Sequence, residues 1–168
     1  MKAYQLVSAI SPALRQEILQ YVQKEANQSF IAALIQIGAQ RKLRPQYFQN
    51  KSREEKAQWL NKQLELKMFD SFTEQILQLW LLKAKVPMLT AFLDATGIEH
   101  DGQGQVNDLP AEIEKSKVEE GVAAMLKDND AEAVALYLHL FQSQRPGGWA
   151  SIAEVLENDE KLKLKAAA

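Results

Sequence analysis

The residues with the most potential for chemistry lie together in one glycine-containing stretch, 98–108. Glu99, His100 and Asp101 are consecutive there and could serve as metal ligands or as an acid–base set. The oxygen-bearing side chains from Asp101 onward imitate a calcium-binding loop, but Val106 stands where such a loop needs glycine. Three consecutive loop residues do not face one ion together, so we interpret the stretch as a solvated connector. A metal-dependent enzyme built around these three residues is the second functional alternative.

No other group of side chains predicts a reaction. The chain has no cysteine, which excludes disulfides, thiol nucleophiles, zinc ribbons and iron–sulfur clusters. Its two histidines are too few for a di-metal carboxylate bundle, and no phosphate-binding loop, dinucleotide fingerprint or nucleophile elbow occurs. His139 lies among Leu138, Leu140 and Phe141, and we interpret it as a core histidine that donates to a backbone carbonyl. We expect no metal and no cofactor, and we favour a non-enzymatic function.

The basic segment, residues 41–56, is the candidate for binding anions. Residues 41–67 carry eight Lys/Arg against three Asp/Glu, and aromatic rings among the cations could stack on unpaired bases. Nucleic-acid or polyanion binding is therefore the first alternative function, although the isoelectric point of about 5.8 is lower than that of most nucleic-acid-binding domains. The competing interpretation is a charged linker whose aromatic residues anchor it to the core. The candidate partner-binding residues are Arg41, Lys42, Arg44, Tyr47, Phe48, Lys51, Arg53 and, after a Pro-Gly-Gly sequence, Trp149.

The stretch 72–98 is the most apolar in the chain and predicts the central element of the core. A helix that is apolar over most of its circumference must be surrounded by other helices. Pro87 divides the stretch into two predicted helices, about 72–85 and 87–96. Gly97 then predicts a left-handed helix end, because only glycine adopts that conformation without a steric cost.

Capping signals mark the starts of other helices. Ser11 before a proline predicts one helix start, and Ser52 with Glu55 three residues later predicts another. Asp108 predicts a helix over 110–127. No segment alternates well enough to form a sheet. We predict an all-α fold, an irregular single-domain bundle of seven or eight helices arranged as antiparallel hairpins, with a solenoid-like stack as the alternative.

Length and hydropathy predict a single cytoplasmic domain. A chain of 168 residues fits one domain, which we place at residues 1–165, and we interpret 166–168 as a tail left by cloning. The N-terminus has no signal-peptide pattern. The longest apolar run is far shorter than the ~20 residues that a membrane helix needs, so we expect no membrane partner.

The charges of the two halves are opposite. Residues 1–85 carry a net charge of +6 and residues 86–168 a net charge of −8. This polarity could attract an anionic partner to the first half or bring two copies together head to tail, or it could only reflect differently charged solvent faces. The leading functional prediction is a non-enzymatic helical protein-interaction module that binds another protein or a second copy of itself.

Overall fold

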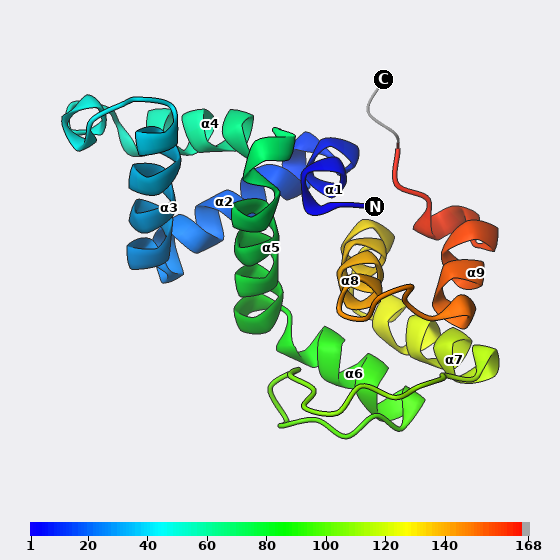
Figure 1. The fold of residues 1–168 in the computed structure, drawn as a ribbon. Helices are drawn as coiled ribbons and strands as arrows, with labels where there is room; N and C mark the ends of the chain where they lie inside the picture. Colours follow the sequence, from blue (N-terminus) through cyan, green and yellow to red (C-terminus); the bar gives the residue numbers. More distant parts are fainter. Residues whose placement is uncertain (166–168) are drawn as a thin grey trace. The chain divides into compact units, whose positions relative to one another are not determined.

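The protein is built of helices throughout the part of the chain that the structure describes. That structure is a computed structural model and describes residues 1–165. It contains nine α-helices and no strand within those residues, which confirms the all-α prediction and is close to the expected number of helices (Figure 1). The interpretation of 166–168 as a cloning tail lies outside the described residues.

Two compact units make up the chain. The N-terminal unit is Lys2–Trp80, and the C-terminal unit begins at Leu81. The expectation of one domain over residues 1–165 stays a prediction. The N-terminal unit contains α1 (Ala3–Ala9), α2 (Pro12–Glu25), α3 (Asn27–Gln40), η1 (Pro45–Phe48), α4 (Arg53–Leu64), η2 (Lys67–Phe69) and most of α5 (Asp70–Ala84).

The helices of the N-terminal unit start where the sequence predicts. The Ser11 hydroxyl accepts a hydrogen bond from the backbone N–H of Leu14 at 3.2 Å, which satisfies a free amide at the start of α2. At the start of α4, Ser52 and Glu55 exchange side-chain and backbone hydrogen bonds, as the capping-box pattern predicts. Helix α2 packs against both α3 and α4.

The C-terminal unit is held together by the packing of α6 (Val86–Thr96) on α7 (Lys115–Leu126). Gly121 of α7 lies so close to Phe92 that an added Cβ would be 2.6 Å from the Phe92 Cδ2. The Phe92 ring in turn contacts Tyr137 and Phe141, with ring centroids 5.6 and 5.5 Å away. The remaining elements of the unit are α8 (Ala131–Ser143), α9 (Ala150–Asn158) and η3 (Glu160–Leu162).

The predicted helix over 110–127 begins later than expected, at Lys115. The reason is that nearby backbone carbonyls have tertiary partners. The Pro110 carbonyl accepts the indole N–H of Trp149 at 2.9 Å, and the Ala111 carbonyl accepts from the Arg145 guanidinium. Residues 97–114 therefore form one long loop, and Asp108 is not a helix cap. The predicted end of α6 is confirmed, because Gly97 has a φ of 71°.

No single helix in the described chain is long and apolar enough to cross a membrane. The segments Lys67–Ala84 and Val86–Thr96 meet the length and composition criteria only as a pair that is interrupted by a break.

The close contact at Gly121 generates a stability prediction. Alanine favours a helix interior by about 1 kcal/mol over glycine, so Gly121→Ala would stabilise an unconstrained helix. Here the new methyl group would overlap the Phe92 ring, and we expect a net loss of about 1–3 kcal/mol in the free energy of unfolding, measured by urea denaturation. The control is Ala123→Gly at an exposed position of α7, which should cost only about 1 kcal/mol. A Gly121→Ala variant more stable than the wild type would contradict this account.

Candidate functional site

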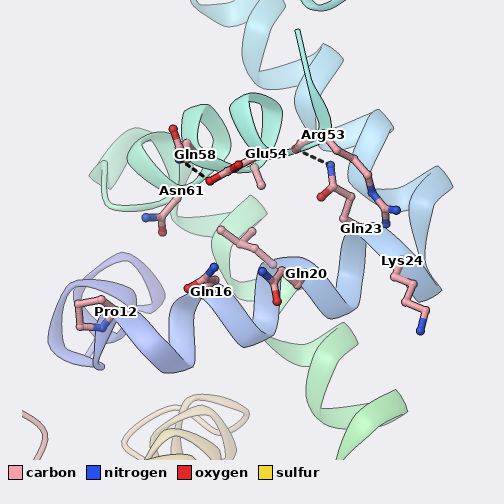
Figure 2. Close-up of a pocket in the computed structure, with 11 residues that line it drawn as sticks. Pro12, Gln16, Gln20, Gln23, Lys24, Arg53, Glu54, Gln58 and Asn61 are labelled. Atoms are coloured by element: carbon pink, nitrogen blue, oxygen red, sulfur yellow. Dashed lines mark hydrogen bonds between the residues drawn. The ribbon is translucent and has the colours of Figure 1, made fainter.

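A groove lies between α2 and α4 in the N-terminal unit. Its volume is about 860 Å³. It is lined by side chains of both helices, and Figure 2 shows them facing one another across it. We call it the α2–α4 groove; its lining residues are Pro12, Gln16, Leu19, Gln20, Gln23, Lys24, Arg53, Glu54, Ala57, Gln58 and Asn61.

Carboxamides dominate the polar lining of the groove. Gln16, Gln20 and Gln23 are four and three residues apart, a spacing that places them on one face of α2. Gln58 and Asn61 are three residues apart on α4 and form the opposite wall. Each carboxamide carries a carbonyl acceptor and two N–H donors, so the groove has both kinds of hydrogen-bonding group along both walls.

Some of these carboxamides have partners and others do not. The buried Gln23 donates through Nε2 to the Arg53 carbonyl at 2.9 Å, which ties α2 to the first turn of α4. Gln58 donates to the Glu54 carboxylate at 3.3 Å. The Asn61 Oδ1 is buried and accepts no hydrogen bond from the described residues, and Gln20 forms none with them. The free hydrogen-bonding capacity of the groove therefore lies in side chains such as Gln20, because the Asn61 Oδ1 is closed to solvent.

Positive charge gathers at one end of the groove. Figure 2 shows Lys24 and Arg53 together at that end and Pro12 at the other. The one carboxylate in the lining, Glu54, already accepts from Gln58. Lys24 forms an ion pair with Glu25 at 3.7 Å, and both Lys24 and Arg53 are exposed, so the cationic end faces solvent.

The predicted basic segment divides into exposed and buried residues. Arg41, Lys42, Arg44 and Arg53 are exposed, and the Lys51 ammonium lies 4.6 Å from the centre of the exposed Tyr47 ring. No Asp or Glu occurs anywhere between residues 26 and 53. The segment is therefore a surface of positive charge, as its composition indicates.

Burial removes Phe48 from the candidate partner surface. Its side chain is 4% exposed, and an added Cβ on Gly38 would lie 2.8 Å from its Cε2. The ring also contacts Trp59, with centroids 4.8 Å apart. Phe48 therefore anchors η1 to α3 and α4, which agrees with the linker interpretation for this one residue.

Arg41 and Lys42 line a second, smaller pocket together with Trp59. Its volume is about 380 Å³, and Gln40, Leu43 and Gln63 complete the lining. We call it the Trp59 pocket. Gln63 is 8% exposed, and its Oε1 is buried with no hydrogen-bond partner among the described residues. No carboxylate lines the pocket.

Lys42 adopts an unusual backbone conformation for its residue type. Its φ is 60°, the left-handed region that favours glycine. The backbone N–H of Leu43 donates to the Gly38 carbonyl at 2.8 Å, and that of Lys42 donates to the Ala39 carbonyl at 3.0 Å. These two bonds close the end of α3 in a Schellman motif, in which Lys42 takes the place usually given to glycine.

The expected exposed anchor, Trp149, is a core residue. Its side chain is 3% exposed and stacks on Phe141, with ring centroids 4.9 Å apart. Its indole N–H donates to the Pro110 carbonyl. The Pro-Gly-Gly sequence before it makes a turn that inserts the ring into the C-terminal unit, so Trp149 is not available to a partner.

The residues 99–101 form no common site. The Asp101 carboxylate accepts the backbone N–H groups of Gln103 and Gln105 at 2.7 and 3.0 Å, and these bonds lower the pKa of Asp101. His100 lies 2.7 Å from Asp94 through Nε2, and its Nδ1 accepts from Gly102. Both ring nitrogens are occupied, so His100 offers no free base.

No cluster of three metal-binding side chains occurs among residues 1–165. The Asp94–His100 and Asp101 hydrogen bonds join neighbouring residues at the end of α6 and in the first half of the loop 97–114, and Gly104 lies against Leu89 of α6. The side chains of residues 99–108 are exposed or half-buried, and the interpretation of the stretch as a solvated connector stays a prediction.

The sequence-based search missed the α2–α4 groove. Its only signal in the sequence is the spacing of Gln16, Gln20 and Gln23 on one face of α2. That signal is weak, because a glutamine face is also common on helices that simply contact water. The glutamine face lines a groove only because α4 packs against α2, and the sequence pattern alone does not predict this packing.

Comparison with known proteins identifies no relative. No family model, curated protein or solved structure matches this chain.

His139 generates a prediction about the pH dependence of stability. The ring is half-buried on α8, and burial lowers its pKa to about 4. The unfolded chain therefore binds a proton near pH 6.5, which the folded protein does not bind until about pH 4. Stability is lost as the pH falls through this window. We expect the free energy of unfolding to drop by about 1 kcal/mol more in the wild type than in His139→Gln between pH 7 and 5. Equal slopes in urea titrations would contradict the shift.

Lys42 generates a second stability prediction. Glycine adopts the left-handed conformation without steric cost, whereas lysine does not. We expect Lys42→Gly to raise the free energy of unfolding by about 0.5–1 kcal/mol in urea denaturation. The control is Lys62→Gly within α4, where glycine should cost about 1 kcal/mol. A loss of stability in Lys42→Gly would show that the Lys42 side chain makes a stabilising contact.

Proposed function

We propose that the chain is a helical protein-interaction module whose α2–α4 groove binds an extended segment of another protein. The observation that supports this function is the set of five carboxamides along the two walls of the groove. An extended peptide has backbone N–H and C=O groups that must be satisfied when it leaves water. Carboxamides can meet both needs, because each one both donates and accepts.

The dimensions of the groove agree with a short peptide. From Pro12 to Lys24 helix α2 extends about 18 Å at 1.5 Å per residue, which matches about five residues of extended chain at ~3.3 Å each. The buried Leu19 and the half-buried Ala57 give the lining an apolar part, against which a peptide side chain can pack.

The cationic end gives the groove a direction. Lys24 and Arg53 would attract a carboxylate of the partner, either from an acidic side chain or from a chain end. Exposed charges contribute mainly to the rate of association and are screened by salt. The hydrogen bonds and apolar contacts in the middle of the α2–α4 groove must therefore hold the peptide. Association of two copies through the opposite charges of residues 1–85 and 86–168 stays a prediction.

Selection from a random heptapeptide display library tests the function. We expect enrichment of peptides with an acidic residue near one end. Binding of a selected peptide, followed by fluorescence anisotropy, should weaken at least tenfold in Gln20→Arg, because the longer side chain fills the groove.

The matched control is Gln36→Arg, which makes the same change at an exposed position of α3 outside the groove. It should bind within twofold of the wild type. If no peptide is enriched, or if Gln20→Arg binds as tightly as Gln36→Arg, the groove does not bind peptides.

A further inference from the structure

We infer that the Trp59 pocket binds a nucleoside monophosphate. This inference concerns a different cavity from the α2–α4 groove and does not rest on the proposed function. The pocket combines two cations, an indole ring and a buried carboxamide within about 380 Å³, a volume in the usual range for small-molecule sites.

The positive charge of the pocket indicates that its ligand carries an anionic group. Arg41 and Lys42 are adjacent and exposed, and neither forms an ion pair with the described residues. Because no carboxylate lines the pocket, a ligand must supply the compensating charge. A phosphate monoester carries about −1.5 to −2 charges at pH 7 and matches two cations better than a single carboxylate does.

The remaining lining indicates a planar ring with polar edges. Trp59 is half-buried and offers indole surface on which a base can stack. The Gln63 Oε1 is closed to solvent and has no partner among the described residues, and a half-turn of the carboxamide would bring this acceptor to the place of the Nε2 donor. Purine and pyrimidine edges carry both donors and acceptors, so either orientation of Gln63 can pair with a base.

Backbone conformation supports a role for Lys42 beyond folding. The end of α3 would form at least as easily with glycine at this position, because φ is positive there. Lysine instead contributes a cation to the pocket lining. Substitution of Lys42 therefore tests binding without a loss of stability: a Lys42→Gly variant remains folded while the pocket loses the cation.

Intrinsic tryptophan fluorescence provides the test. Trp80 and Trp149 are 0% and 3% exposed, so quenching by a bound ligand reports mainly on Trp59. The ligands are the monophosphates of adenosine, guanosine, cytidine and uridine, together with adenosine alone, inorganic phosphate alone and a single-stranded hexanucleotide. We expect saturable quenching by at least one monophosphate, with an affinity at least tenfold higher than for its nucleoside or for phosphate.

Variants of the lining residues test whether the fluorescence quenching comes from binding in the Trp59 pocket. Arg41→Ala and Lys42→Gly should each weaken binding at least tenfold, whereas Lys62→Ala, an exposed lysine of α4 outside the pocket, should stay within twofold of the wild type. The proposal fails if no monophosphate saturates below 10 mM, if phosphate alone binds equally well, or if Lys42→Gly binds like the wild type. A hexanucleotide that binds more than tenfold tighter than every monophosphate would identify a nucleic-acid chain as the ligand and would also overturn it.

Discussion

Each unit of this protein depends on an aromatic ring seated against a helix glycine. In the N-terminal unit Phe48 lies against Gly38, and in the C-terminal unit Phe92 lies against Gly121; a methyl group on either glycine would be 2.8 or 2.6 Å from the ring. Interiors are packed as densely as organic crystals, so such contacts leave no freedom to slide. The first holds η1 beside the end of α3, and the second holds α6 on α7.

Helix α4 contributes to both candidate sites because its sides meet different neighbours, α2 and α3. Toward α2 it presents Gln58 and Asn61 to the groove, and toward the end of α3 it presents Trp59 and Gln63 to the smaller pocket. These residues alternate along two turns of one helix. One helix therefore contributes a wall to each of the two cavities.

The features that the sequence predicted well are local ones. Ser11 and Ser52 cap helices through neighbours three residues away, and the glycine at 97 ends α6 for reasons contained in its own backbone. The failures involve distant partners. The late start of α7 and the burial of Trp149 involve the same contact, a hydrogen bond from the Trp149 indole N–H to the carbonyl of Pro110, 39 residues away. The carboxamide groove was missed for the same reason, since it exists only where two helices meet.

The absence of any Asp, Glu or His between residues 26 and 53 determines how that surface responds to acidity. Histidine is the side chain whose ordinary pKa lies in the physiological range, so a stretch without histidine has no side chain whose charge is expected to change there. Any pH dependence in the capture of an anion there must come from the anion. A phosphate monoester, whose second proton leaves near pH 6, would be held more strongly in neutral than in acidic surroundings, with the protein itself unchanged.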